Sequence, residues 1–260
     1  MMILDRIAET KKREVQLLKE AFPLWGLKKA VSTMPPARSF RAAISGRPCS
    51  IIAEVKRHSP SKGIIREDFD PAAIASVYEE NGASAVSVLT DEHYFRGKGS
   101  YIADIKNTVR IPVLRKDFII DPYQIYETRV MGADAVLLIT RILKSDMLEY
   151  CIELAGSLGL SALVEVHSRK ELEIALGAGA DIIGINNRDL GTFKTDLQNS
   201  LDLAPLIPDD RIAVSESGIH ARKDIEMLMM KGIHAFLVGE ALMKAQDIGR
   251  KLKDLLGREV

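Results

Sequence analysis

Four segments of the chain repeat one pattern, in which a glycine is followed by a short apolar run. These glycines are spaced by 50, 47 and 53 residues, at Gly82, Gly132, Gly179 and Gly232. Glycine often ends a helix and a short apolar run is typical of a buried strand, so each segment predicts a helix end followed by a strand. Three further strand candidates lie midway between the repeats, at 112–116, 161–166 and 211–216. With the apolar run 51–56, the sequence predicts eight strands.

Helical patterns fill the intervals between these strands. Asp70 precedes Pro71 and Asp121 precedes Pro122, which favours helices that begin with an aspartate cap. Helices are expected at 71–81, 100–109, 122–131, 145–158, 168–177, 220–231 and 247–256, with the weakest pattern at 100–109. Alternating strands and helices imply parallel strands, and eight units of about 25 residues match an α/β fold of the (β/α)8 TIM barrel type. A doubly wound open sheet is the alternative, although no Gly-x-Gly-x-x-Gly follows the first strand.

About 50 residues precede the first expected strand. Apolar residues recur at helical spacing over 2–20, and a short helix is expected near 39–44, after the chain-breaking Met34-Pro-Pro36. This segment either packs on the outside of the barrel or caps a substrate pocket. We therefore expect residues 1–260 to form a single barrel domain, with 1–49 as an N-terminal helical extension.

The composition excludes several classes of protein. Lys+Arg and Asp+Glu both total 36, a balance that gives no support to nucleic-acid binding. No apolar run has the length of a membrane span, and the N-terminus lacks a signal-peptide pattern. Cys49 and Cys151, the two cysteines, have no metal or redox spacing, so we expect a reduced, cytoplasmic setting and no metal.

Charged and polar residues stand at the ends of the expected strands. In a barrel of this type the active site lies at the C-terminal ends of the strands. Because side chains alternate along a strand, six of these residues are expected to point inward together: Glu54, Lys56, Lys116, Glu165, Asn186 and Ser217. Others, Thr90, Asn187, Arg188 and Glu216, lie beside them. Two lysines and two glutamates at one mouth indicate acid and base chemistry, although a buried ion pair can also be structural.

The last two units carry glycine turns suited to a phosphate. Ser217-Gly218-Ile219 and Gly239-Glu240 are each expected to open a helix, and backbone N–H groups at such positions bind phosphate. Ser59, after the first strand, could add a hydroxyl. Ordinary glycine turns are the alternative.

Other candidates are weaker. Arg96-Gly-Lys-Gly-Ser100 lacks the spacing of a nucleotide P-loop, and a flexible basic lid is the preferred interpretation. The histidines have no ligand spacing, so surface or loop roles are expected for His58, His93, His167, His220 and His234. Lys116 could form a Schiff base with a carbonyl, and the residues alone do not decide this.

Taken together, these motifs resemble the indole-3-glycerol-phosphate synthase family of tryptophan biosynthesis. The resemblance rests on Ile52–Ser61, Leu114–Phe118, Leu163–Glu165, Gly184–Leu190 and Ser215–Ile219, and it extends from Leu4-Asp-Arg-Ile-Ala to Gly239-Glu-Ala-Leu-Met243. It implies that an anthranilate-bearing deoxyribulose 5-phosphate is converted to indole-3-glycerol phosphate with loss of CO2 and water, without cofactor or metal. The partner would be this small phosphorylated molecule, with no membrane or nucleic acid, and the chain a monomer or weak homo-oligomer.

The resemblance also implies residue roles. Lys116 would be the general acid, with Glu165 facing it. Lys56 would be an acid for the dehydration and Glu54 a base or an orienting group, and the resemblance leaves open which residue makes each proton transfer. Asn186 and Ser217 would contact the substrate, and the substrate or its phosphate would be held by Ser59, Arg188, Glu216, Gly218, Gly239 and Glu240. Glu240 replaces a frequent family serine and Ser215 a common alanine, which leaves the side-chain role of Glu240 open. We expect a lysine beside a second cation to have a lowered pKa.

Two alternatives differ from this activity. One is another phosphate-binding barrel enzyme related to phosphoribosylanthranilate isomerase, which lacks a comparable N-terminal extension and uses a different acid and base pair. The other is a non-catalytic phosphosugar-binding barrel, which would lack at least one of Lys116, Glu165, Glu54 and Lys56. All four are present.

Overall fold

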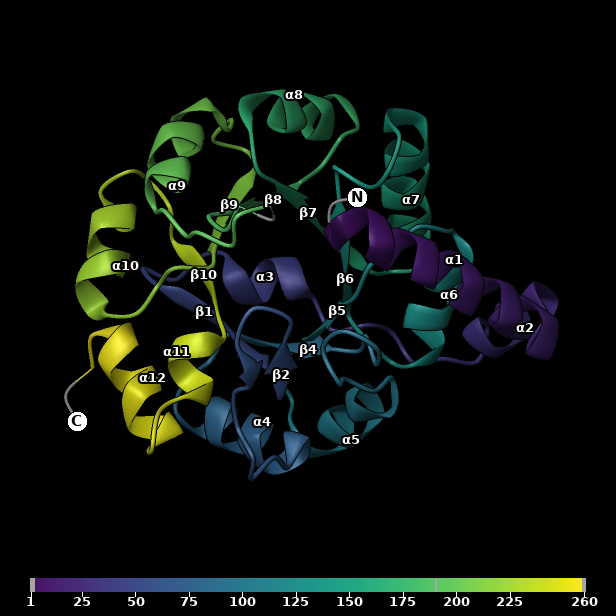
Figure 1. The fold of residues 1–260 in the computed structure, drawn as a ribbon, viewed down its shortest axis with the longest axis horizontal. Coiled ribbons are helices and arrows are strands. Elements are labelled where there is room, and N and C mark those ends of the chain that lie inside the picture. Colours follow the sequence, from purple (N-terminus) through teal and green to yellow (C-terminus); the bar gives the residue numbers. More distant parts are fainter. Residues whose placement is uncertain (1–2, 190, 259–260) are drawn as a thin grey trace.

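The computed structural model describes residues 3–189 and 191–258. Five residues lie outside this description: Met1, Met2, Leu190, Glu259 and Val260. Met2 belongs to the predicted first helix, and Leu190 is the last residue of the Gly184–Leu190 motif. In the described part of the chain, eight parallel strands close into a barrel in the order β1-β4-β5-β6-β7-β8-β9-β10 (Figure 1). The predicted (β/α)8 TIM barrel is thus confirmed.

The barrel strands agree with the apolar runs of the sequence to within a few residues. They are β1 (Ser50–Val55), β4 (Ala85–Leu89), β5 (Val113–Lys116), β6 (Ala135–Ile139), β7 (Ser161–Val166), β8 (Ile182–Asn186), β9 (Ile212–Glu216) and β10 (Ala235–Val238). A two-stranded hairpin, β2 (His58–Ser59) with β3 (Gly63–Ile64), follows β1 and was not predicted.

Helices surround the strands as the periodicity predicts. They are α4 (Pro71–Glu80), α5 (Ser100–Thr108), α6 (Tyr123–Val130), α7 (Ser145–Ser157), α8 (Arg169–Gly177), α10 (Arg222–Met229) and α12 (Ile248–Leu256). Asp70 caps α4 as expected, because its carboxylate accepts from the N–H groups of Ala72 and Ala73 at 3.0 Å. Two short helices were missed: α2 (Leu24–Val31) and α9 (Gln198–Leu203), which continues into the 3-10 turn η1 (Ala204–Leu206). Helix α11 (Glu240–Met243) begins at Gly239-Glu240, as predicted.

The expected helix start at Ser217-Gly218-Ile219 is wrong. The chain leaves β9 through a loop in which Ser217 and Gly218 both have positive φ, of 68° and 81°. The helix α10 begins only at Arg222, where the Asp224 carboxylate accepts from the N–H groups of His220 and Ala221. The positive φ values prevent helix entry directly after the strand, because an α-helix requires negative φ.

The core has two parts, on either side of the strands. Ile51, Ala53 and Val55 of β1 face the surrounding helices, whereas Ile52 faces the barrel interior. The same alternation on the other strands fills the interior with small and branched side chains. The predicted inward direction of Glu54 follows, since it lies two residues beyond Ile52.

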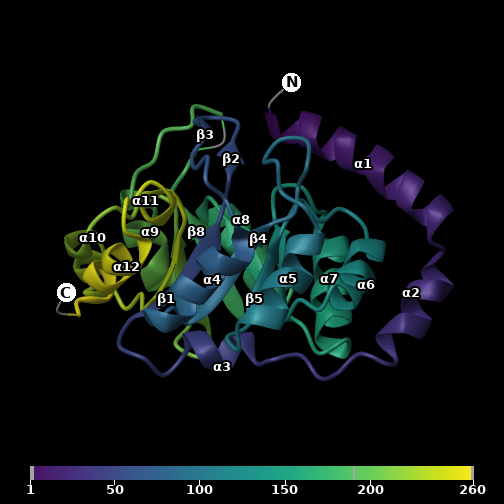
Figure 2. The same cartoon turned by 90° about the horizontal axis from the view of Figure 1, so that it is seen from below.

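The N-terminal segment encloses both ends of the barrel. Helix α3 (Phe40–Ile44) lies beneath the strands, where Phe40 and Ile44 are fully buried and close the N-terminal end (Figure 2). Helix α1 (Ile3–Ala21) starts near the opposite end, on the side of the β2–β3 hairpin, and runs outward past α6. Both predicted alternatives therefore hold in part. The start of α1 reaches the mouth of the barrel, while the rest of the helix packs on the outside.

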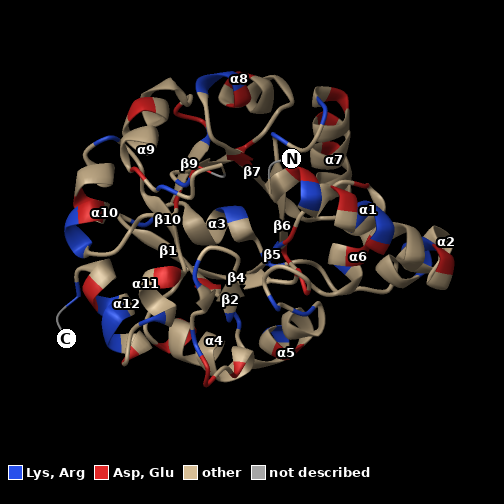
Figure 3. Cartoon of the chain, viewed as in Figure 1, with Lys and Arg blue, Asp and Glu red and all other residues tan. Residues whose placement is uncertain are grey.

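The outer surface carries mixed charge. Lys and Arg alternate with Asp and Glu around the helical ring (Figure 3). Within residues 3–189 and 191–258, no helix combines the length and apolar character that a bilayer crossing requires.

Candidate active site

A pocket opens at the C-terminal ends of the strands, the position that the barrel predicts for an active site. Among its lining residues are Glu54, Lys56, Ser59, Lys116, Glu165, Asn186, Arg188, Glu216, Ser217, Gly218, Gly239 and Glu240. The structure thus brings every residue of the predicted site to one pocket. The other strand-end residues, Thr90 and Asn187, belong instead to buried hydrogen-bond networks.

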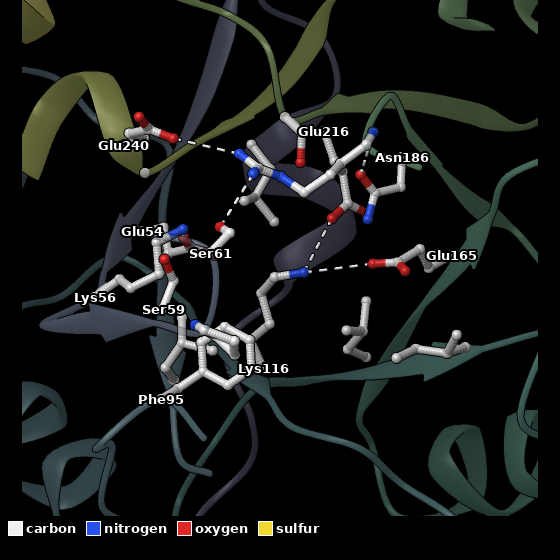
Figure 4. Close-up of a pocket in the computed structure, with 18 of the residues that line it drawn as sticks. Glu54, Lys56, Ser59, Ser61, Phe95, Lys116, Glu165, Asn186, Glu216 and Glu240 are labelled. Carbon is white, nitrogen blue, oxygen red and sulfur yellow. Dashed lines mark hydrogen bonds and ion pairs between the residues drawn. The ribbon is translucent and has the colours of Figure 1, made fainter. Parts of the chain in front are cut away.

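Lys116 lies at the centre of the charged groups. Its Nζ is 3.1 Å from Glu216 Oε2 and 3.5 Å from Glu165 Oε2, and it points between the two carboxylates (Figure 4). Burial would lower the pKa of Lys116, but the carboxylates of Glu216, Glu165 and Glu54 raise it well above its ordinary value. The expectation of a lowered lysine pKa is therefore wrong, because three anions outweigh any neighbouring cation.

Glu216 occupies a different place from the one predicted. We expected Ser217 to continue the inward face of its strand and Glu216 to bind the substrate or its phosphate. Instead Glu216 follows the inward Val214, is 1% exposed and pairs with Lys116. Burial and the neighbouring Glu165 raise the pKa of Glu216 to about 7, although Lys116 opposes this shift.

Two glycines make room for these carboxylates. A Cβ atom on Gly184 would lie 2.1 Å from Glu216 Oε1, and one on Gly239 would lie 2.2 Å from Glu54 Oε1. Any other residue at either position would displace the carboxylate. Gly184 and Gly239 therefore shape the charged centre, whatever else the Gly239 turn binds.

Glu54, on β1, forms an ion pair with Lys56, the residue that directly follows this strand. Burial would raise the pKa of Glu54, but the charges of Lys56 and Lys116 lower it below the ordinary carboxyl value. Tyr78 of α4 donates to the backbone carbonyl of Glu54 at 3.0 Å, which fixes the strand end. The pair thus presents one buried anion and one partly exposed cation to the pocket.

A second group of polar residues lies on the β8, β1 and β10 side of the mouth. Arg188 donates to Ser61 and to Glu240, both at 3.3 Å, and thereby links three loops (Figure 4). Lys244 binds the other oxygen of Glu240 at 2.7 Å. Burial would raise the pKa of Glu240, but Lys244, Lys62 and Arg188 lower it, so the carboxylate is ionised.

Ser215 and Asn187 hold the loop that carries Arg188. Asn187 Nδ2 donates to Ser215 Oγ at 2.9 Å, and Ser200 Oγ lies 2.8 Å from the same atom. The serine at a position where alanine is common in the resembled family thus has a hydrogen-bonding role here.

The polar residues at the strand ends did not predict the apolar wall of the pocket. Phe95 and Phe118 lie with ring centroids 5.9 Å apart, and further apolar residues line the pocket: Ile3, Leu4, Ile7, Leu89, Leu137 and Ile139. The position of Phe118, two residues beyond Lys116, was an available signal. Arg96 and Lys98 of the expected basic lid are exposed and are not among the residues that line this pocket.

His167 is a loop residue, as predicted, but it is not on the surface. It lies between β7 and α8, and its side chain is only 4% exposed and lies beside Glu165. His220 lines the pocket, while His93 and His234 are exposed. Within the described residues, no group of His, Cys, Asp and Glu side chains is arranged to hold a metal ion.

Comparison with known proteins agrees with this site. The family model described as indole-3-glycerol phosphate synthase matches residues 4–255. The chain belongs to the indole-3-glycerol phosphate synthase family. A relative of that name from Alkaliphilus metalliredigens (strain QYMF) is 50% identical over 256 residues, covering 98% of each chain. One from Endomicrobium trichonymphae is 49% identical over 98% of this chain and 99% of the relative.

More distant solved structures share the fold alone. A 3-hexulose-6-phosphate synthase has a TM-score of 0.65 at 14% identity, covering 80% of this chain and 98% of that one. A thiamine phosphate pyrophosphorylase from Pyrococcus furiosus has a TM-score of 0.62 at 17% identity, covering 81% and 95%. The predicted indole-3-glycerol phosphate synthase family and its lyase activity in tryptophan biosynthesis are confirmed by the close relatives, and the isomerase alternative is not favoured.

Proposed function

We propose that the Lys116 centre closes the indole ring of an anthranilate-bearing deoxyribulose 5-phosphate. The single observation that carries the proposal is the ammonium of Lys116 between the carboxylates of Glu165 and Glu216, in a pocket with one apolar and one polar side. Ring closure develops negative charge on a carbonyl oxygen, and an ammonium in a buried pocket can stabilise and protonate that oxygen.

The charge state of Lys116 favours an acid over a nucleophile. A Schiff base requires a neutral amine, which enzymes obtain by lowering the lysine pKa. Here the surrounding carboxylates raise the pKa of Lys116, so the amine stays protonated. Of the two roles that the sequence left open for Lys116, the general acid is therefore the better supported.

The remaining roles follow from position. Glu165 faces Lys116 and serves as the base, while Glu54 and Lys56, on the adjoining wall, serve the loss of water. Glu216 joins the acid and base group and does not contact the phosphate, because it is buried against Lys116. Asn186 and Ser217 supply polar contacts to the substrate.

The two sides of the pocket match the two ends of this substrate. Phe95 and Phe118 offer an apolar surface to the aromatic ring. Ser59, Arg188 and the backbone at Gly218 and Gly239 line the polar side and would hold the phosphate. The positive φ of Ser217 and Gly218 turns this backbone back on itself, as in other anion-binding loops.

The direct test follows indole-3-glycerol phosphate by its fluorescence after the anthranilate substrate is added. Glu54→Gln and Lys56→Arg, each with ring closure and dehydration monitored separately, test the assignment on β1. We expect both variants to accumulate the ring-closed intermediate. If ring closure is lost but dehydration is kept, Glu54 and Lys56 instead hold Lys116 and the substrate in position.

We further propose that residues 1–260 act as a single domain in the cytoplasm, as a monomer or weak homo-oligomer, without cofactor, metal or nucleic acid. Both cysteines, Cys49 and Cys151, are free, which suits a reducing compartment. Sedimentation of the purified chain tests the oligomeric state.

A further inference from the structure

Behind the catalytic carboxylate lies a chain of charged groups that the reaction scheme does not use. Glu165 has one oxygen toward Lys116 and the other, Oε1, 3.4 Å from His167 Nε2. On its far side, His167 Nδ1 is 3.2 Å from Glu171 Oε2, and Arg141 binds the second oxygen of Glu171 at 2.9 Å. The groups thus lead from the pocket to Arg141, whose side chain is 31% exposed.

Local structure explains why Glu171 holds the histidine ring. Ser168 caps α8 by accepting from the N–H of Glu171, and Glu171 reaches back to accept from the backbone N–H of His167 at 2.8 Å. This reciprocal cap fixes the Glu171 carboxylate beside Nδ1. Burial would raise the pKa of Glu171, but His167 and Arg141 lower it, so the carboxylate is ionised.

The hydrogen bonds determine where the ring carries its proton. An ionised carboxylate only accepts, so Nδ1 must donate to Glu171 and carries a proton. The opposite atom, Nε2, is buried and has no hydrogen-bond partner among the described residues. If His167 is neutral and Glu165 is ionised, the lone pair of Nε2 points at a lone pair of Oε1 and the two atoms repel each other. A proton between Nε2 and Oε1 would turn this repulsion into a hydrogen bond.

We propose that His167 is a positioning residue for Glu165 that takes over the proton which Glu165 removes from the substrate. Glu165 becomes a carboxylic acid in that step; its O–H bond then breaks and an N–H bond forms at Nε2. The carboxylate of Glu165 is thereby restored, and the imidazolium keeps its Nδ1 proton on Glu171. Because Nε2 is buried and faces Glu165, its proton passes back through Glu165 to solvent in the pocket once the product has left. This inference rests on the proposed role of Glu165 as the base.

The surrounding charges suit this use. The groups that face the ring are Glu165 from β7, Glu171 from α8 and Arg141 from the loop after β6. Burial would lower the pKa of His167, but the hydrogen bond of Glu171 and the charges of Glu165 and Glu171 raise it above its ordinary value. The ring can therefore hold a proton near neutral pH.

Two variants test the proposal through the pH dependence of kcat. His167→Asn keeps a donor to Glu171 but has no acceptor at Nε2. We expect its kcat to fall by about 10- to 100-fold with little change in KM. The acid limb of the profile should move to lower pH, because protonation of the histidine no longer limits the enzyme. His234→Asn, which changes an exposed histidine, is the matched control and should leave both quantities unchanged.

Glu171→Gln is the second variant, because glutamine keeps the cap but removes the charge that raises the pKa of His167. We expect its acid limb also to move to lower pH, with the plateau largely retained. Acid limbs that stay in place in both variants would overturn the proposal, even if kcat falls, since packing alone predicts that result. If His167→Asn does not fold, Glu171→Gln decides.

A measurement without turnover separates this inference from the proposed function. NMR titration of the His167 ring should give a lower pKa in Glu165→Gln than in the parent chain. If the parent chain makes no indole-3-glycerol phosphate, the proposed function fails. If it does, but Glu165→Gln leaves the pKa of His167 unchanged, only the link between the two residues fails.

Discussion

Two neighbouring residues at the end of β5 belong to charge clusters of opposite character. Lys116 is one ammonium beside Glu165 and Glu216, with Glu54 close enough to affect its pKa. Asp117 is a carboxylate between two cations, Arg115 at 3.1 Å and Lys11 of α1 at 3.0 Å, and it also accepts from Thr90 at 2.6 Å. Lys11 in turn binds Asp91 at 2.9 Å.

The central carboxylates of these clusters have opposite pKa shifts. Arg115 and Lys11 overcome burial and lower the pKa of Asp117 to about 2, so the acid stays ionised at any physiological pH. Around Lys116 the carboxylates exceed the cations, and the pKa of Glu216 is raised. The same residue types at the same end of the barrel thus hold one central carboxylate, Asp117, between two cations, and leave another, Glu216, sharing one ammonium with Glu165.

The largest effect on activity should come from the reactive cluster. Lys116→Met removes the ammonium that pairs with both Glu165 and Glu216, so we expect turnover to fall by about 10³-fold or more. Stability should be largely kept, because the remaining carboxylates can take up protons. Product fluorescence and thermal unfolding measure the two quantities. Near-normal indole formation would remove Lys116 from the role of acid.

The largest effect on stability should come from the structural cluster. Lys11→Met leaves the buried Asp91 without its cation, so we expect a loss of about 3–5 kcal/mol in the free energy of unfolding. The pKa of Asp117 is below its unfolded value, so its contribution is lost as pH falls through about 2. In the variant this acid transition should move to higher pH. Lys12→Met, on the exposed face of α1, is the control and should change little.

Glu216 gives a smaller, pH-dependent effect. Its pKa is about 7 in the folded chain, above the ordinary 4.5, so the folded state binds more protons between these values and stability falls as pH rises through this window. Glu216→Gln should remove that fall, which is on the order of 1–3 kcal/mol. Denaturant unfolding at pH 5 and pH 8 measures it. Equal pH dependence in the parent chain and the variant would contradict the raised pKa.

The sequence predicted what depends on period and missed what depends on packing between distant segments. Apolar alternation located the eight strands and the inward direction of Glu54, Lys116 and Glu165, because a strand fixes the facing of its side chains. It failed at Glu216, which follows the inward Val214 and pairs with Lys116. Ser217 also lines the pocket, because the strand ends there and its backbone is left-handed. It also missed α2, because prolines on both sides suggested a break in the chain.

The buried positions of some charged side chains were equally invisible. His167 is a loop residue as predicted, but the sequence did not show that its ring lies between Glu165 and Glu171, with Arg141 bound to Glu171. Lys11 looked like one of many surface lysines of an amphipathic helix, yet it is 4% exposed. Its role follows from where α1 passes the ends of β4 and β5, beside Asp91 and Asp117, which no local pattern encodes.

The smallest expected effect on activity concerns Glu240. This residue differs from both clusters above, because its carboxylate lies where the substrate phosphate should bind. Its carboxylate already holds Arg188 at 3.3 Å and Lys244 at 2.7 Å, so an arriving dianion must compete for Arg188 and is repelled at short range. Glu240→Ser should therefore lower KM by about three- to fivefold with kcat unchanged. Glu240→Gln keeps the size and removes only the charge, and it should give the same change if repulsion is the cause.

High salt should reduce the gain in both Glu240 variants, since exposed charges are screened over about 8–10 Å at moderate ionic strength. A higher KM in both variants would mean that Glu240 orders Arg188 for the substrate. In that case the Glu240 carboxylate would resemble Asp117, which is ionised and holds two cations in place, more than Glu216, whose pKa is raised by burial.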